Sequence, residues 1–436
     1  MAVAERGLGR LPHEPYPASD LLRFSTAGSV DDGKSTLIGR LLHDSKGIFE
    51  DQLAALELAT RRRGGDGIDL ALLTDGLRAE REQGITIDVA YRYFATPRRK
   101  FIVADTPGHL QYTRNMVTGA STADLAIILV DARSGVVEQT RRHLVIAALL
   151  RVPHLVVAVN KMDLVEFAED QFDPIEREIR TYASGVGIGE ITVIPVSALR
   201  GDNVVTGSPA LAWYRSPALL EHLETVERPT REIDGPLRMP IQWVIRDRTN
   251  AGYRAFAGRI ERGRVRTGDL VTALPSNVTT RIEAIDTFDD ALEEAFAPLS
   301  VAIRLVDDVD LGRGGLIAAA GDAPEPRREL LTTVCWLGAT PLTAGRRYRL
   351  SHGTQTVRAV ASSLDACLDI NSLELVPEPD QLAMNEIGRV RLTLAEPIFA
   401  DSYRESRSTG SAILVDEATN ETVGAVLIQD DDTPWP

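Results

Sequence analysis

The chain has 436 residues, 44% of them hydrophobic, which is enough for about three domains of ordinary size. No apolar run reaches the about 18 residues of a transmembrane helix, and the N-terminal segment lacks the apolar core of a signal peptide. We therefore expect a cytoplasmic protein in which residues 1–20 form a mobile tail. The formal charge of −15 disfavours sequence-independent nucleic-acid binding, and Cys335 and Cys367 lack the spacing of a zinc site or a disulfide framework.

A glycine-rich segment lies between a strand-like run, residues 21–27, and a helix-like run, residues 36–42. Strand, glycine loop and helix are the context that a phosphate-binding loop requires. The loop's backbone N–H groups would face phosphates, Lys34 would contact the β- and γ-phosphates, and Ser35 would ligate Mg²⁺. The predicted phosphate contacts are Gly28, Ser29, Val30, Asp31, Asp32, Gly33, Lys34, Ser35 and Thr36.

The next stretch is charged and contains the basic, glycine-broken segment at residues 61–65, which we interpret as a solvated loop in preference to a nucleic-acid patch. It leads to Thr86. A threonine after such a segment can contact Mg²⁺ and the γ-phosphate and release them when that phosphate leaves. Its position between two nucleotide motifs predicts this switch role.

The apolar run at residues 101–104 ends in the contiguous motif Asp105, Thr106, Pro107, Gly108 and His109. An aspartate at a strand end can hold Mg²⁺ through water, and the Gly108 N–H can meet the γ-phosphate. His109 stands where a side chain is needed to orient water for in-line attack, so we predict it as the catalytic residue. The predicted metal ligands are Ser35, Thr86 and Asp105.

Two continuous apolar runs, residues 125–130 and 155–159, are typical of parallel strands covered on both faces. The second leads into Asn160, Lys161, Met162 and Asp163. The Asp163 carboxylate can accept hydrogen bonds from guanine N1–H and the 2-amino group, whereas adenine would leave it unpaired. After a strand at residues 191–196, a backbone N–H within Ser197, Ala198 and Leu199 can meet guanine O6. These motifs predict a GTP-binding domain.

Residues 201–217 are rich in Gly, Ser and Pro and predict a surface loop, followed by a closing helix at residues 219–223. Prolines mark linkers at residues 229–240 and 323–326, and the segments after each alternate in polarity with turn signals between them. We predict an α/β P-loop GTPase domain with a mostly parallel sheet at residues 21–228. Two small β-barrel domains follow, at residues 237–322 and 327–430.

This domain order resembles the translational elongation factors such as elongation factor Tu, although Ser29 and Asp32 stand where those factors usually have His. The chain resembles more closely the GTPase (large) subunit of bacterial ATP sulfurylase, sulfate adenylyltransferase subunit 1. One departure is Ser406, where that family commonly has Asn. The resemblance spans almost the whole chain and is carried by residues 28–40, 72–94, 105–109, 111–116, 197–204, 385–388 and 407–416.

The resemblance implies a coupled reaction with GTP and Mg²⁺ as cofactors. A separate small catalytic subunit of sulfate adenylyltransferase, bound in a heterodimer or larger complex, would join ATP and sulfate to give adenylylsulfate and pyrophosphate. GTP hydrolysis on this chain would drive that step, without nucleic acid or membrane. A translation-factor-like GTPase that binds aminoacylated RNA and a GTP-gated scaffold without coupled chemistry are the alternatives. Because no lysine follows Lys161, we expect no second phosphate loop and no adenylylsulfate kinase activity.

Overall fold

The computed structural model of the chain describes residues 20–45, 89–107, 113–227, 233–246, 253–288 and 290–430. Thr86, Gly108, His109 and the predicted tail before Asp20 lie outside these ranges. Within them, no helix has both the length and the apolar character needed to cross a membrane.

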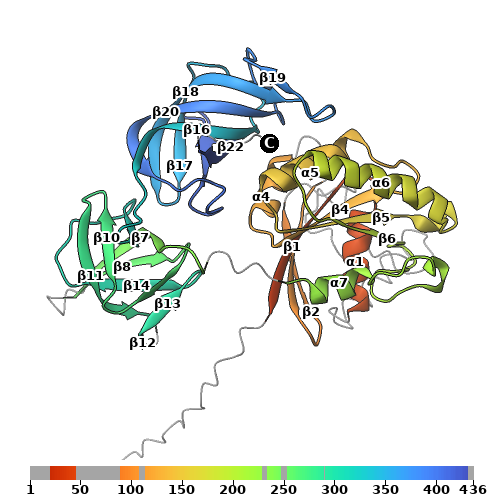
Figure 1. Ribbon diagram of the computed structural model, residues 1–436, viewed down its shortest axis with the longest axis horizontal. Coiled ribbons are helices and arrows are strands. Elements are labelled where there is room, and N and C mark those ends of the chain that lie inside the picture. The colour runs from red at the N-terminus through yellow and green to blue at the C-terminus, as the bar shows by residue number, and fades with distance from the viewer. Residues whose placement is uncertain are drawn as a thin grey trace, which may run out of the picture.

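The N-terminal part is a six-stranded sheet in the order β2-β3-β1-β4-β5-β6, with helices on both faces (Figure 1). Only the edge strand β2 runs antiparallel to its neighbour. The strands are β1 (Leu21–Gly28), β2 (Ala90–Ala95), β3 (Lys100–Asp105), β4 (Leu125–Asp131), β5 (His154–Asn160) and β6 (Thr192–Pro195). The helices are α1 (Lys34–Asp44), α4 (Thr113–Ser121), α5 (Glu138–Leu149), α6 (Glu169–Gly185), α7 (Leu219–Thr225) and the 3₁₀ turns η3 (Met162–Val165) and η4 (Pro209–Leu211).

Strand β4 shows why this sheet needs cover on both faces. All of its residues are buried, and side chains alternate between the two faces of a strand. Leu125, Ile127 and Leu129 therefore join the apolar core beneath α1 and α7, whereas Ile128 and Val130 join the core beneath α4, α5 and α6. The continuous apolar run that predicted a doubly covered parallel strand is explained by this alternation.

The prediction of a surface loop at residues 201–217 is wrong in part. Trp213 and Tyr214 pack against Phe172 of α6, with ring centroids 5.2 and 6.4 Å from it, and Leu211 in η4 is buried. The Trp213 indole N–H also donates to the Phe167 carbonyl at 2.8 Å. The segment is rich in glycine, serine and proline, but its few large apolar side chains decide its position because they bury the most apolar surface.

The C-terminal part contains two closed six-stranded rings, which Figure 1 shows as separate barrels. In the first, β10-β15-β7-β8-β14-β11 closes through β10–β11 pairing, and in the second, β17-β21-β22-β16-β20-β18 closes through β17–β18 pairing. This confirms the predicted fold class. The first barrel includes β7 (Arg238–Arg246), β8 (Arg254–Arg259), β9 (Arg264–Arg266), β10 (Leu270–Leu274), β11 (Val278–Asp286), β12 (Ala291–Leu292), β13 (Glu294–Phe296), β14 (Ser300–Leu305) and β15 (Leu316–Ala319). The second includes β16 (Pro326–Trp336), β17 (Arg347–His352), β18 (Gln355–Leu368), β19 (Leu375–Pro377), β20 (Ile387–Phe399), β21 (Ser411–Val415) and β22 (Thr422–Gln429).

A buried ion pair joins the two barrels. The Arg238 guanidinium, at the start of β7, donates to both carboxylate oxygens of Asp401 at 2.9–3.1 Å, and both side chains are 4% exposed. Thr409 donates to the same carboxylate at 2.5 Å. If the barrels separated or rotated, each partner would be left as an uncompensated buried charge. The ion pair therefore favours this one orientation of the two barrels.

Candidate nucleotide-binding and catalytic site

The predicted nucleotide motifs converge at the carboxyl edge of the sheet. In parallel strands the carboxyl ends share one edge, where α/β proteins bind their ligands. Strand pairing sets Thr26 of β1 beside Asp105 of β3, and Asp131 of β4 beside Asn160 of β5. The loop after β6 continues the same edge to Ser197, and residues 197–201 are here called the base loop. Residues of the phosphate loop and of the base loop, which are far apart in sequence, therefore lie together.

The phosphate loop reverses direction at Gly33, whose φ of 87° is in the left-handed region that favours glycine. A Cβ at Gly33 would lie 2.4 Å from the Asn160 side-chain nitrogen, so glycine is also required by this close approach. Helix α1 begins directly afterwards with no side-chain cap and no acidic residue in its first turn. Its first backbone N–H groups are therefore suited to bind an anion.

Lys34 lies buried at this helix start. Its ammonium is 2.8 Å from Asp105 Oδ1 and also donates to the Thr106 carbonyl. The Thr106 hydroxyl is itself committed, donating to the Thr26 carbonyl at 2.6 Å. Lys34 and Asp105, which are 71 residues apart, are therefore already paired where phosphate and Mg²⁺ chemistry was predicted.

The side chains present fit a divalent cation next to Asp105. Among the described residues, Asp105 Oδ2 is buried and has no hydrogen-bond partner, which is unusual for a carboxylate oxygen. Oxygen ligands of this kind are the ones that Mg²⁺ prefers. The partly exposed Ser35, in the first turn of α1, is the second predicted ligand in the described part.

Not every predicted contact offers a side chain. Met162 is fully buried and packs in the core beneath α5 and α6. Val30 is 43% exposed and Leu199 is 68% exposed, so only their backbone groups suit a polar ligand.

Asp32 holds the phosphate loop from within. Its Oδ2 accepts the Ser29 N–H at 2.6 Å, and its side chain is buried. Burial raises the pKa of Asp32 to about 6, although the hydrogen bond from Ser29 lowers it in part and the nearby Asp131 adds to the increase. The folded protein therefore holds this carboxylate at a cost in free energy when the carboxylate is ionised.

This cost predicts a pH-dependent stability that Asp32→Asn removes. Because the folded-state pKa lies above the ordinary value of 3.8, the contribution of Asp32 is favourable below about pH 4 and is lost as the pH rises through about 6. The contribution of Asp32 to the unfolding free energy should fall by about 3 kcal/mol over that range. The amide oxygen introduced by Asp32→Asn would still accept the Ser29 N–H, so urea unfolding should show the variant gaining stability relative to the native protein as pH rises. A constant difference across this range would contradict the assignment.

The base loop is attached to the phosphate loop through Asn160. The Asn160 amide nitrogen donates to the Asp32 carbonyl at 2.7 Å, and its oxygen accepts the Ala198 N–H at 2.9 Å. The Ser197 hydroxyl donates to Asp163 Oδ1 at 2.6 Å. These bonds bring the two predicted base-contacting segments side by side.

Sequence reasoning missed Asp131. Lys161 is 2.9 Å and Arg133 is 2.6 Å from its Oδ2. Burial alone would raise the pKa of Asp131, but hydrogen bonds from Arg133 and Lys161 outweigh burial and hold it well below its usual range. Asp131 thereby orients the Lys161 stem beside the base loop. Its position directly after the apolar run of β4, at the ligand-binding edge, was the available signal.

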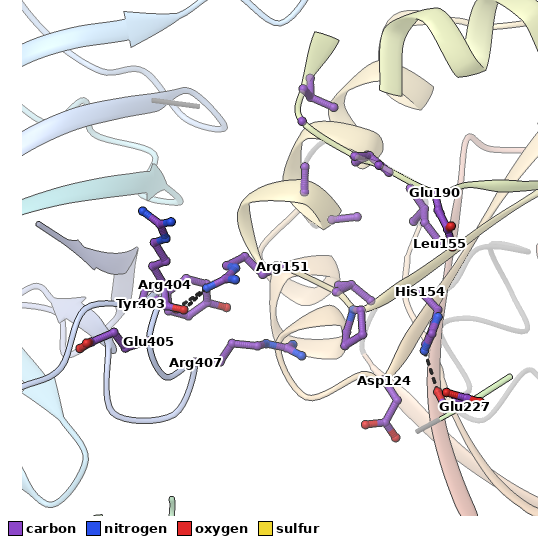
Figure 2. Close-up of a pocket in the computed structure, with 18 residues that line it drawn as sticks. Asp124, Arg151, His154, Leu155, Glu190, Glu227, Tyr403, Arg404, Glu405 and Arg407 are labelled. Atoms are coloured by element: carbon purple, nitrogen blue, oxygen red, sulfur yellow. Dashed lines mark hydrogen bonds between the residues drawn. The ribbon is translucent and has the colours of Figure 1, made fainter. Parts of the chain in front are cut away.

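A separate cavity, of about 640 Å³, lies between the α/β domain and the second barrel (Figure 2). Figure 2 shows Arg151 reaching across to Tyr403 and Arg404, whose carbonyls it contacts, while Arg407 points toward the α/β domain. Arg407 donates to three carbonyls at the end of α4, on Ala120, Ser121 and Ala123, at 2.7–3.3 Å. No phosphate-loop residue lines this cavity, so it is distinct from the candidate nucleotide site.

Comparisons with known proteins match the α/β domain to a GTP-binding domain family and the second barrel to a related C-terminal domain family. The family described as "Elongation factor Tu GTP binding domain" matches residues 19–276, and "GTP-eEF1A C-terminal domain-like" matches residues 329–429. Sulfate adenylyltransferase subunit 1 of Aeromonas hydrophila is 49% identical over 430 residues, which cover 98% of this chain and 90% of that protein.

The chain belongs to the sulfate adenylyltransferase subunit 1 family. This confirms the resemblance inferred from its sequence motifs. The bifunctional enzyme CysN/CysC of Mycobacterium tuberculosis is 53% identical over 411 residues, 94% of this chain, and the chain spans 67% of that relative's length. A solved structure of sup35 complexed with GDP matches 96% of this chain and 97% of its own, with 21% identity and a TM-score of 0.43.

The family membership also bears on the predicted alternatives. Relatives with the subunit 1 name align over both barrels as well as the α/β domain, at 48–49% identity. The GTPase fold of this subunit 1 family member is therefore shared with the elongation factors, whereas its overall sequence is that of the sulfate adenylyltransferase subunits. The translation-factor alternative is the less supported one.

Proposed function

We propose that this chain is the GTP-hydrolysing subunit of sulfate adenylyltransferase and couples GTP hydrolysis to the formation of adenylylsulfate and pyrophosphate from ATP and sulfate. The observation that carries the GTP part is the set of side-chain contacts around the base loop. Asn160 joins the phosphate loop to Ala198, and the Ser197 hydroxyl donates to Asp163. This arrangement directs a carboxylate to the guanine edge, which adenine would leave unpaired.

The phosphate end of the site would bind GTP by an exchange of partners. Lys34 would leave Asp105 for the β- and γ-phosphates. The Asp105 carboxylate would be neutralised by bound Mg²⁺, and the phosphate oxygens would then be the stronger acceptors for the Lys34 ammonium. Asp105, through its unpartnered oxygen, and Ser35 would hold Mg²⁺, and Mg²⁺ when bound would neutralise charge on the phosphates. Three further roles are proposed from the sequence alone. Thr86 would be the switch residue, the Gly108 N–H would contact the γ-phosphate, and His109 would orient the attacking water.

The adenylyl transfer is assigned to a partner. The relatives' names describe a numbered subunit, which implies a second subunit in those proteins. We infer a small catalytic subunit that binds ATP and sulfate and forms a heterodimer or larger complex with this chain in the cytoplasm. The motifs of this chain account for one nucleotide site, and its Asp163 disfavours adenine there.

This division of labour gives a direct test. The purified chain should hydrolyse GTP slowly and make no adenylylsulfate from ATP and sulfate. Adding the catalytic subunit should yield adenylylsulfate in amounts that rise with GTP and not with a non-hydrolysable GTP analogue. Synthesis by the isolated chain would refute the assignment.

Two further outcomes separate the alternatives. Retention of aminoacylated RNA on a filter only in the presence of GTP would favour the translation-factor alternative. A partner that binds without changing GTP hydrolysis would favour a scaffold.

A further inference from the structure

Arg40 connects the phosphate-loop helix to the base loop. It lies on α1, six positions after Lys34, and its Nε donates to the Ala198 carbonyl at 3.2 Å. Its Nη2 donates to the next carbonyl, that of Leu199. The Arg40 side chain is 19% exposed, and its Nη1 is also 3.5 Å from Asp44 Oδ1, one turn further along the helix. Nothing in the sequence motifs assigned a role to this residue.

The first two backbone N–H groups of the base loop already have hydrogen-bond acceptors within the protein. The Ser197 N–H donates to the Asp202 carbonyl at 3.0 Å, and the Ala198 N–H donates to Asn160 Oδ1 at 2.9 Å. In the described part of the chain, the Leu199 N–H has no such partner. The contact with guanine O6 was predicted for one of these three N–H groups, and the Leu199 N–H is the one that remains available.

Arg40 donates to the carbonyl of that same peptide group. The Ala198 carbonyl and the Leu199 N–H belong to one peptide, and the chain's cis peptides, within the described residues, are elsewhere. In a planar trans peptide the C=O and N–H point in opposite directions. Since Arg40 holds the carbonyl toward α1, the Leu199 N–H is turned away from α1. A cation on the carbonyl also polarises the amide and makes its N–H a stronger donor.

The turn formed by residues 197–201 lies directly against the Arg40 side chain. Gly201, with φ of +86°, lies so that a Cβ there would be 3.5 Å from Arg40 Cδ and from Asp44 Oδ2, and its N–H closes the turn on the Ser197 carbonyl at 2.7 Å. The base loop is therefore held by two side chains: Arg40 donates to the Ala198 carbonyl, and Asn160 accepts the Ala198 N–H.

We propose that Arg40 is a positioning residue for guanine recognition, which aims the Leu199 N–H at the 6-oxo group of the base. This inference rests on the proposed function, because it deepens how the same site selects GTP. Arg40 would act through the base loop and would not touch the nucleotide.

The test compares GDP with a nucleotide that lacks the 6-oxo group. 2-Aminopurine riboside 5′-diphosphate keeps the 2-amino group and both phosphates, but loses the N1–H together with the 6-oxo group. The comparison is therefore made within each nucleotide, between the native protein and the variant. Binding of each to the full chain is measured by displacement of a fluorescent GDP analogue. Arg40→Ala should weaken GDP binding about tenfold and change binding of the 2-aminopurine nucleotide by less than about twofold.

Two further variants keep the test decisive. Arg40→Lys retains the charge but loses the fork that reaches two carbonyls, so its GDP affinity should lie between those of the native protein and Arg40→Ala. Arg180→Ala removes an arginine that donates to the Ile191 carbonyl at 2.9 Å, away from the base loop, and should leave both affinities unchanged. If Arg40→Ala does not fold, the ratio of the two affinities in Arg40→Lys carries the comparison.

The outcomes distinguish this inference from the proposed function. Equal losses of both nucleotides in the Arg40 variants, or no loss of either, would overturn the role of Arg40. A native protein that prefers GDP to ADP but does not prefer GDP to the 2-aminopurine nucleotide would overturn the Leu199 contact. A native protein without preference for GDP over ADP would instead overturn the GTP-binding function itself.

Discussion

Asp163→Asn should weaken GTP binding by about 10²-fold or more and move preference toward xanthosine triphosphate. The Asp163 carboxylate would accept two hydrogen bonds from guanine. Replacing it with an amide leaves at least one of these bonds unmade, and an unpaired polar group in such a site strongly weakens binding. The Ser197 hydroxyl already donates to one Asp163 oxygen. In the variant the amide oxygen would keep that bond, so the amide nitrogen would face the base and donate to a 2-oxo group.

Competition binding with GTP, xanthosine triphosphate and ATP measures this change. Asp170→Asn, in the exposed first turn of α6, is a matched control that changes the same functional group without facing the site. Equal affinity of the native protein for ATP and GTP would refute the base-recognition role of Asp163, as would a variant that still prefers GTP over xanthosine triphosphate.

His109→Ala should lower the rate of GTP hydrolysis by about 10²-fold or more and leave GTP affinity nearly unchanged. Orienting the attacking water is needed only in the transition state, so its loss reduces kcat without removing ground-state contacts. The sequence places His109 directly after Asp105, Thr106, Pro107 and Gly108.

Single-turnover hydrolysis and nucleotide binding, each measured with the catalytic subunit present, separate the two effects. His154→Ala offers a control, since the His154 ring contacts the Glu227 carbonyl and not the phosphate loop. Normal hydrolysis by His109→Ala would remove this residue from the mechanism, and a parallel loss of GTP affinity would mean that it binds ground-state nucleotide.

The sequence by itself determined where several strands lie along the chain and the identity of the local motifs. Continuous apolar runs predicted β4 and β5 because strands buried on both faces must be apolar at every position. Gly33 and Lys34 were recognisable for a similar reason, since a left-handed backbone and a compact cation are requirements of single positions. Features of this kind depend on neighbours within a few residues, so they remain visible in a sequence without coordinates.

Only the tertiary structure decided how these motifs support one another. Arg40 meets the base loop across 158 residues, and Lys34 meets Asp105 across 71. The core beneath α4 and α5 also extends into the second barrel through Leu337 and Leu427. No local pattern encodes such contacts, because an arginine on an exposed helix face and a leucine on a strand look the same whether or not a distant segment packs on them. Their partners are set by how sheet, helices and barrels pack in three dimensions.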